Sequence, residues 1–201
     1  MKLYFSPGAC ALASQIALRE AGLIFDLVRV DLRSKESADG NFWDINPKGY
    51  IPVLKLNDGQ VLTEGAAILQ WVADQKPEKS LIPRWGTPER YRAIEWLNFI
   101  STELHKGIGG LFNATFAEEA RANIKERVGK RLEYVDQQLA QKPWLMGSDF
   151  SVCDAYLYNI VRWTVSTKID ISAHKNLLGF MERMQLRPNV IESLKAEGLE
   201  K

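Results

Sequence analysis

Apolar positions in the first third of the chain alternate between the period of a strand and that of a helix. Residues 3–5 form a short β-prone run, which the breaker Pro7-Gly8 ends. Apolar residues then recur at helical spacing as far as Gly22, which we place as the C-cap: Ala11, Leu12, Ile16, Ala17 and Leu18. Alternation over 25–30 predicts a second strand, whereas the polar stretch 33–40 is compatible with either a loop or a weak helix.

A hairpin and a further helix complete this part of the pattern. Two β-prone runs, 53–56 and 60–62, are joined by Asn57-Asp58-Gly59, whose Asp-Gly pair favours a tight turn. Apolar residues over 66–73 then predict a helix. A right-handed crossover would make the first two strands parallel, and the hairpin adds an antiparallel pair. The order of elements predicts a small α/β domain over residues 1–77.

Beyond Pro77 the strand pattern disappears. Prolines and a glycine mark residues 78–86 as a linker. A helix is expected to begin at Thr87-Pro88, where a hydroxyl N-cap precedes a proline at the first helical position. We expect this helix to run to about His105, before the glycine-rich segment 107–110 disrupts it.

Capping motifs define the later helices. Thr115-x-x-Glu118 resembles a capping box, and Ser151-x-x-Asp154 is a second one; both precede apolar residues at helical spacing. Two shorter helical stretches follow, near 174–186 and 189–197. Residues 87–201 are therefore predicted to be all-helical, and the fold class is α/β followed by all-α.

Composition limits what the protein can do. The 201 residues are 46% hydrophobic, and 26 basic side chains against 25 acidic ones leave a formal charge of +1. That balance gives no long-range attraction for nucleic acid or an anionic membrane, so neither is expected as a partner. The N-terminal apolar run is too short for a signal peptide, and no apolar stretch approaches the ~18 residues of a membrane span. We expect a cytoplasmic protein, in which Cys10 and Cys153 are thiols.

Cys10 is the first candidate for chemistry. It follows the Pro7-Gly8 turn at the predicted start of the first helix, where backbone N–H groups and the helix dipole favour a thiolate. A small buried hydrophobic side chain is an alternative of equal weight from the local sequence alone. Ala13 stands where a dithiol reductase would carry its second cysteine, which disfavours that chemistry.

Two loops have features that suit a peptide-like ligand. In the segment 46–52 (NPKGYIP), a cis bond before Pro52 would expose the backbone of Ile51 to an extended peptide, although the local sequence favours a stiff loop. Glu64 and Gly65 lie at the entrance to the third helix, where N–H groups suit a carboxylate and the Glu64 side chain suits an ammonium. By itself, Glu64 is more often a first-turn acid that stabilises its own helix.

A polar stripe lies on the long helix that starts at Pro88. Asn98, Thr102 and His105 share one face at α-helical spacing. The stripe either lines a cleft or is a solvated helix surface, and the solvated interpretation is favoured when the helix is considered alone. His174 has no partner in the sequence and receives no role.

These features occur together and in one order, and in this the chain resembles the beta class of bacterial glutathione transferases from Met1 to Lys201. The segments similar to that class's active site, glutathione-binding loops, first long C-domain helix and capping segment are 6–14 (SPGACALAS), 46–52 (NPKGYIP), 62–65 (LTEG), 95–98 (EWLN), 102–107 (TELHKG) and 151–156 (SVCDAY).

The resemblance implies a thioredoxin-like N-terminal domain, an all-helical domain that carries the electrophile pocket, and a homodimer. Ile51 would pair with the cysteinyl backbone of glutathione through a cis bond to Pro52. Glu64 and Gly65 would bind the γ-glutamyl end, and Lys35 the glycyl carboxylate. The residues implied to complete the site, some of them from the partner subunit, are Asn98, Thr102, Glu103, Leu104 and His105.

The implied function is conjugation of the glutathione thiolate to hydrophobic electrophiles, a detoxification reaction with glutathione as substrate and with no cofactor or metal. The thiolate is a far better nucleophile than the thiol, so stabilising it is the catalytic task. Cys10 would face the sulfur, and the thiolate would be stabilised by Cys10 as a hydrogen-bond donor, by His105 or by the helix N-terminus. Tyr4 and Ser6 also supply hydroxyls, but their positions fit less well, and Cys153 is interpreted as core.

Two other functions stay open. The first is glutathione-dependent thiol–disulfide exchange, in which Cys10 forms a mixed disulfide with glutathione. The second is a non-catalytic carrier of hydrophobic ligands. Pro52, Ser151 and Asp154 are expected to have structural roles under all of these functions.

Overall fold

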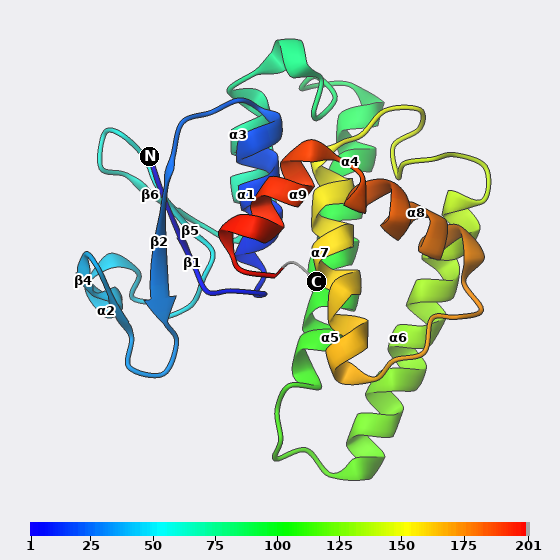
Figure 1. Cartoon of the computed structure of the whole chain (residues 1–201). Coiled ribbons are helices and arrows are strands. Elements are labelled where there is room, and N and C mark those ends of the chain that lie inside the picture. Colours follow the sequence, from blue (N-terminus) through cyan, green and yellow to red (C-terminus); the bar gives the residue numbers. More distant parts are fainter. Residues whose placement is uncertain (200–201) are drawn as a thin grey trace. The chain divides into compact units, whose positions relative to one another are not determined.

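The computed structural model describes residues 1–199 (Figure 1). Packing divides the chain into two compact units: Met1–Ile82 together with the segment that begins at Arg187, and Pro83–Leu186. The sequence pattern places the last helix with the other helices of the second half of the chain. In the structure this helix packs on the first helix and so belongs to the first unit. The predicted domain boundaries stay a prediction, and the last two residues of the predicted helical domain lie outside the described part.

The first unit is built on a mixed β-sheet, as the strand pattern predicted. Within residues 1–199 the strand order is β4-β3-β2-β1-β5-β6. β1 pairs in parallel with β2 and antiparallel with β5, and β5 and β6 form the predicted hairpin. The strands are β1 Lys2–Phe5, β2 Asp26–Asp31, β3 Glu36–Ser37, β4 Gly40–Asn41, β5 Val53–Lys55 and β6 Val61–Thr63.

The polar stretch after β2 forms a second hairpin, β3–β4, rather than the loop or helix that the sequence allowed. Asp31 Oδ1 accepts the N–H groups of Arg33 and Ser34 at 2.7 and 3.1 Å, and Lys35 then adopts φ = 60°. Asn41 caps a short helix that the pattern did not predict, α2 (Phe42–Ile45). Strands of two residues contain too little alternation to be recognised from their period.

Three longer helices belong to the first unit. α1 (Ala11–Glu20) contacts α3 (Gly65–Asp74), α9 (Pro188–Ala196) and β1, and the three helices lie next to one another in Figure 1. α1 is buried along most of its length as a result. Its C-cap is Ala21, and Gly22, the predicted C-cap, follows one position later with φ = 67°. A 3-10 turn, η1 (Pro77–Lys79), follows α3.

The second unit is helical in the part of the chain described. α4 begins as predicted, because the Thr87 side chain accepts the N–H of Arg90 at 3.3 Å. No helix in residues 1–199 combines the length and the apolar character needed to cross a bilayer. The helices of this unit are α4 Pro88–Phe99, the π-helical segment η2 Ile100–His105, α5 Lys106–Gly110, α6 Glu118–Leu139, α7 Val152–Thr167 and α8 Lys175–Gln185.

Two predictions about this unit are wrong. The glycines do not interrupt the long helix, which continues through η2 and α5. A Cβ on Gly107 would lie 2.7 Å from Val128 Cγ2, so this glycine allows α5 to pack closely on α6. Thr115 does not cap α6, because its hydroxyl donates to Asn113 Oδ1 at 2.7 Å and the N-cap is Ala117.

The predicted capping box at the start of α7 is confirmed. Asp154 Oδ2 accepts hydrogen bonds from the N–H and the hydroxyl of Ser151, both at 2.8 Å. Its Oδ1 accepts the N–H of Leu145 at 2.8 Å, which ties the preceding loop to the helix. Asp154 is fully buried, and burial raises the pKa of its carboxyl group from an ordinary 3.8 to about 6, against the lowering effect of these bonds.

This titration predicts how stability depends on pH. The folded pKa of Asp154 lies above the unfolded value, so the folded state binds more protons between about pH 4 and pH 6. The contribution of Asp154 to stability is therefore present at low pH and is lost as the pH rises through about 6. Relative to Asp154→Asn, which cannot titrate, the wild type should lose about 2 kcal/mol of unfolding free energy between about pH 4 and pH 7.5. Urea denaturation at both pH values measures the difference, and a pH-independent difference contradicts the assignment.

Candidate functional site

Cys10 lies at the N-terminus of α1, as the sequence predicted. Its backbone is helical (φ = −67°, ψ = −15°), and its Sγ donates a hydrogen bond to the carbonyl of Ile51 at 3.4 Å. The side chain is half-buried, which contradicts the alternative of a fully buried core thiol. At this position the positive end of the helix dipole lowers the free-energy cost of ionising the Cys10 thiol.

The loop before β5 is held by one buried side chain. Asn46 Nδ2 donates to the carbonyl of Tyr50 at 2.7 Å, and its Oδ1 accepts the N–H of Lys48 at 3.2 Å. The loop ends at Ile51-Pro52, whose peptide bond is cis, as the resemblance implied and the local sequence did not favour. The stiffness expected from two prolines is therefore reinforced by a side chain that bonds across the turn.

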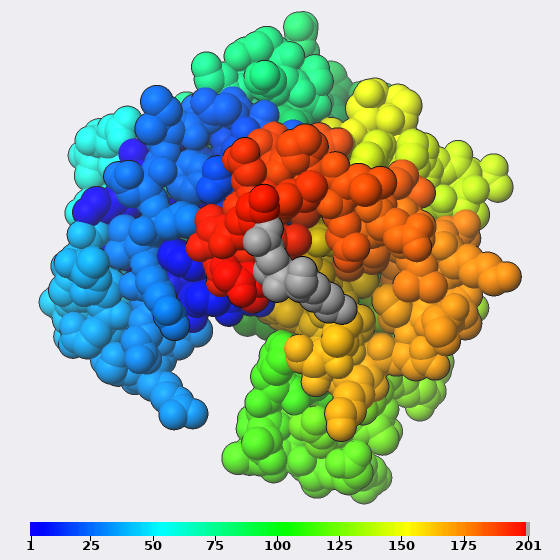
Figure 2. Space-filling model, in the orientation of Figure 1, coloured from blue at the N-terminus to red at the C-terminus, as the bar shows by residue number. Residues whose placement is uncertain are grey.

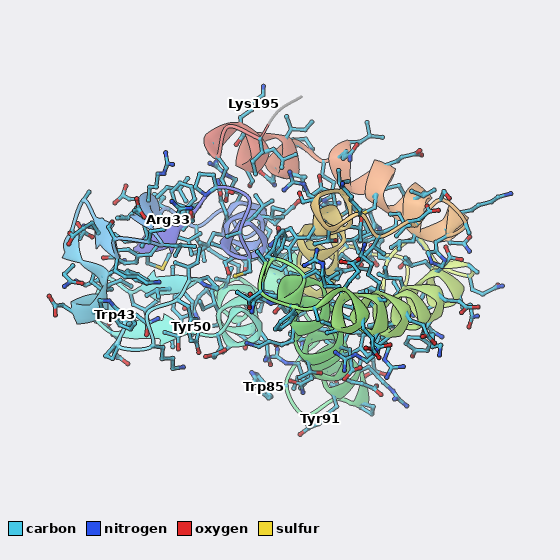
Figure 3. All side chains as sticks on the ribbon, turned by 90° about the horizontal axis from the view of Figure 1, so that it is seen from below. Arg33, Trp43, Tyr50, Trp85, Tyr91 and Lys195 are labelled. Carbon is cyan, nitrogen blue, oxygen red and sulfur yellow. The ribbon has the colours of Figure 1, made fainter. Side chains whose placement is uncertain are left out.

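Lys35 lies against the same loop. Its Nζ donates to the carbonyl of Gly49 at 2.7 Å and lies 5.6 Å from the centre of the Trp43 ring. Gly49 has φ = 69°, and a Cβ there would lie 2.3 Å from the Trp43 indole. The loop, the indole and the Lys35 ammonium thus pack as one cluster, beside which Figure 3 labels Trp43 and Tyr50.

Glu64 directly precedes Gly65, the first residue of α3. Its backbone has a positive φ (φ = 68°, ψ = 113°), and its side chain does not cap its own helix. Instead, Glu64 Oε1 accepts hydrogen bonds from Lys48 Nζ at 2.8 Å and from Tyr50 Oη at 2.6 Å. The bond to Glu64 raises the pKa of Lys48 and that of Tyr50. The Glu64 carboxylate thus faces the 46–52 loop and accepts a hydrogen bond from the Lys48 ammonium of that loop.

Tyr4 takes part in another network. Its hydroxyl donates to Asp39 Oδ2 at 2.6 Å, and Lys2 Nζ donates to the same carboxylate. Burial and this bond raise the pKa of Tyr4, while Lys2 and Tyr4 lower the pKa of Asp39. The Ser6 carbonyl accepts the N–H of Ala9 in the turn that leads to Cys10. Tyr4 is therefore bound to a carboxylate and is a poor donor to a sulfur.

The predicted polar stripe of the second unit lies on α4 and η2. Asn98 is exposed and Thr102 is exposed, and the Thr102 hydroxyl donates to the Asn98 carbonyl at 3.0 Å. Glu103 Oε2 accepts Arg131 Nε at 2.8 Å, and Leu104 is buried. A π-helical turn contains an extra residue, so the α-helical spacing that placed the stripe on one face does not hold through this segment. A π-helix inside an α-helix is frequent at functional sites.

His105 is half-buried among aromatic rings rather than solvated. Its Nδ1 is hydrogen-bonded to Tyr156 Oη at 2.7 Å, and its ring lies edge-to-face with Trp163 at 5.0 Å between centroids. Phe112 also packs edge-to-face on Trp163, at 5.5 Å. The solvated interpretation of the stripe is thus wrong for His105, whose ring orientation is set by α7.

Several residues that hold the predicted site residues in place were not predicted from the sequence. Tyr156 and Trp163 lie seven residues apart on α7, so a helical wheel places them on one face, but nothing local indicates that this face meets His105. Trp43 lies on a helix that was not predicted. Cys153 is buried, with Sγ 3.4 Å from the Ala93 carbonyl, and burial raises the pKa of its thiol, as its interpretation as core expects.

Comparisons with known proteins agree over both units. Two family models match the chain: the glutathione S-transferase N-terminal domain over residues 8–75 and the C-terminal domain over residues 99–188. Glutathione S-transferase GstA of Escherichia coli O157:H7 is 44% identical over 200 residues, covering 99% of this chain and 100% of that protein.

Solved structures give the same result. A bacterial beta class glutathione S-transferase of Sphingomonas chungbukensis is 45% identical, with a TM-score of 0.95 and coverage of 100% of both chains. A sphingomonad glutathione S-transferase complexed with glutathione is 42% identical, also with a TM-score of 0.95 and 100% coverage of both chains.

The cluster around Gly49 predicts the effect of one added methyl group. Gly49→Ala should destabilise the protein through its positive φ, by about 1–2 kcal/mol, and through the clash with Trp43, by roughly a further 1–3 kcal/mol. Gly59→Ala is the matched control, since Gly59 has φ = 88° and a Cβ added there would meet no atom within 4 Å. Denaturant unfolding and glutathione titration of both variants provide the measurement. Equal losses of stability and unchanged glutathione affinity would contradict the packing described for this loop.

Proposed function

The chain belongs to the beta class of the glutathione S-transferase family, and from this premise we propose how its residues carry out the reaction. It is a transferase that conjugates its substrate glutathione. The observation that carries our assignment of the site is the 3.4 Å contact between Cys10 Sγ and the Ile51 carbonyl at the N-terminus of α1. There a thiol lies beside a peptide backbone, with Glu64 and Lys35 on the adjoining loops.

We assign the binding of glutathione to the first unit as follows. Ile51 pairs with the cysteinyl backbone, and Glu64 and Gly65 bind the γ-glutamyl end. The support for a role of Glu64 in binding the γ-glutamyl ammonium is that its Oε1 accepts a hydrogen bond from the Lys48 ammonium at 2.8 Å. Lys35 binds the glycyl carboxylate, and its Nζ, 2.7 Å from the Gly49 carbonyl, is held beside the loop that supplies Ile51. The sphingomonad relative solved with glutathione supports this class of ligand.

Catalysis consists of stabilising an anionic sulfur. The glutathione thiol releases its proton to water. The thiolate then attacks the electrophilic carbon, and the carbon–sulfur bond forms as the bond between that carbon and the leaving group breaks. The Cys10 thiol, which donates to the Ile51 carbonyl in the structure, would redirect this hydrogen bond to the glutathione sulfur at the positive end of α1. His105 contributes a second polar group, and its ring is oriented by the 2.7 Å bond to Tyr156. Four further residues of the second unit are assigned to glutathione binding on the resemblance alone: Asn98, Thr102, Glu103 and Leu104.

A second activity, thiol–disulfide exchange, is favoured by the half-buried state of Cys10. The Cys10 thiolate would attack glutathione disulfide, form a mixed disulfide and release one glutathione thiolate, so that electrons and atoms balance. No observation favours a non-catalytic carrier. The hydrophobic nature of the electrophile, the role in detoxification and the cytoplasmic location stay predictions.

We further propose that the enzyme is a homodimer, as the resemblance implies. Light scattering at micromolar concentration should report about twice the chain mass of 22.8 kDa. A mass equal to that of a single chain at this concentration would contradict the proposed homodimer. It would also contradict the assignment of any site residue to a partner subunit.

The roles of Cys10 and His105 can be separated by measuring both reactions. Cys10→Ala should abolish mixed-disulfide formation, because exchange needs a protein sulfur. Conjugation of an aryl halide should fall roughly 100- to 1000-fold but survive, since the helix N-terminus and His105 still stabilise the glutathione anion. His105→Ala should slow conjugation and leave exchange at Cys10 measurable. The variant with both substitutions completes a double-mutant cycle, which measures whether Cys10 and His105 act independently. If Cys10→Ala removes conjugation as completely as exchange while glutathione still binds, Cys10 is essential to the transfer step itself.

A further inference from the structure

The C-terminal helix contacts the turn that leads to Cys10. Glu197 Oε2 accepts the N–H of Gly8 at 2.8 Å, a bond between residues 189 positions apart. Glu197 is only 6% exposed. A hydrogen bond from a backbone N–H to a buried carboxylate is among the stronger ones in proteins, because one partner carries a charge and water is excluded.

The end of α9 directs this carboxylate toward the turn. Glu197 is the C-cap, and Gly198 follows with φ = 68°. The Gly198 N–H donates to the Lys195 carbonyl and the Leu199 N–H to the Leu194 carbonyl, both at 2.9 Å, which is a Schellman ending. The reversal brings Leu199 back toward Gly8: a Cβ on Gly8 would lie 3.8 Å from Leu199 Cδ2.

α9 itself is fastened to α1 along one face. Val190, Ser193 and Glu197 are buried, at spacings of three and four residues. Arg187 Nε donates to Glu20 Oε1 at 2.8 Å at the start of α9, and Gln15 Nε2 donates to the Ser193 carbonyl at 3.5 Å in its middle. Figure 2 shows the red C-terminal residues packed against blue N-terminal ones, and Figure 3 shows Lys195 on the outer side of α9.

The turn needs such a partner because its own residues fix it weakly. Gly8 adopts φ = 76°, a conformation open to glycine but one of many that glycine can adopt. The turn has a local bond from the Ala9 N–H to the Ser6 carbonyl at 3.1 Å, and Cys10 begins the helix two residues after Gly8. Any change in the Gly8 backbone is therefore transmitted directly to the position of the Cys10 sulfur.

We propose that Glu197 is a positioning residue for the transferase reaction, which holds the Gly8 turn and thereby the Cys10 sulfur in place. This rests on the proposed role of Cys10 and extends it, because it makes the C-terminal helix a part of the active-site framework. The carboxylate acts through the backbone and does not itself contact the substrate.

The test compares three variants. Glu197→Ala removes the acceptor, and Glu197→Gln keeps an acceptor oxygen but removes the charge. Glu192→Gln is the matched control, since Glu192 is an exposed carboxylate of the same helix that pairs with Arg19 of α1 at 3.2 Å. The readouts are amide hydrogen exchange of Gly8, the rate of Cys10 alkylation across pH, and kcat and KM for glutathione, with alkylation of the buried Cys153 as the marker of unfolding.

We expect Glu197→Ala to speed exchange at Gly8 without affecting the amides in the middle of α1, and to lower kcat roughly tenfold with a smaller change in KM. Glu197→Gln should recover only part of this loss, because it keeps an acceptor oxygen but lacks the charge that strengthens the bond, and Glu192→Gln should behave as the wild type. Unchanged Gly8 exchange or unchanged kcat in Glu197→Ala overturns the proposal. So does equal behaviour of the Ala and Gln variants, because the acceptor oxygen that Gln keeps would then make no difference to the Gly8 turn.

Two further outcomes are distinguishable. If Glu197→Ala does not fold, the comparison of Glu197→Gln with Glu192→Gln decides, because only the first is expected to alter Gly8 exchange and kcat. If Cys10→Ala leaves both conjugation and exchange intact, the proposed role of Cys10 fails, and with it the catalytic half of this proposal. The Gly8 exchange rates then still report whether Glu197 holds the turn.

Discussion

The position of β1 in the middle of the sheet is the constraint on which the site of the first unit depends. β1 pairs in parallel with β2 and antiparallel with β5, with Tyr4 opposite Val53. This register puts the end of β1 beside the start of β5. The turn that leaves β1 toward Cys10 and the loop that enters β5 through Ile51 therefore emerge next to each other. Cys10 Sγ lies 3.4 Å from the Ile51 carbonyl as a direct consequence.

Buried polar side chains then hold the backbone near that edge and elsewhere. Asn46 bonds across the 46–52 loop, Glu197 holds Gly8, and Asp154 accepts three bonds at the start of α7. Each is largely or wholly buried, so each needs its bonds to offset the loss of water. Loops with few apolar side chains cannot be fixed by packing alone. A hydrogen bond to a buried acceptor stabilises such a loop and, because the bond is directional, also restricts its backbone conformation.

The second unit uses aromatic packing and an irregular helix for the same purpose. η2 interrupts the α-helical spacing between α4 and α5, and His105, its last residue, contacts Tyr156 and Trp163 of α7. An imidazole held by a hydrogen bond and by ring contacts loses less freedom when it acts on a substrate than one on a solvated surface would. Gly107 adds to this arrangement, since it lets α5 approach α6 closely.

The sequence by itself determined the features that depend on local chemistry. The alternation over 25–30 predicted β2, Asp58-Gly59 predicted the hairpin, Thr87-Pro88 predicted the start of α4, and Ser151-x-x-Asp154 predicted the start of α7. The ordered set of motifs also identified the family. Only the tertiary structure decided that α9 packs on α1, that Glu197 meets Gly8 and that Tyr156 meets His105. The physical reason is separation along the sequence. A cap or a turn forms among neighbouring residues, whereas the two side-chain contacts join residues that are 51 and 189 positions apart. No local pattern specifies which buried face packs against which.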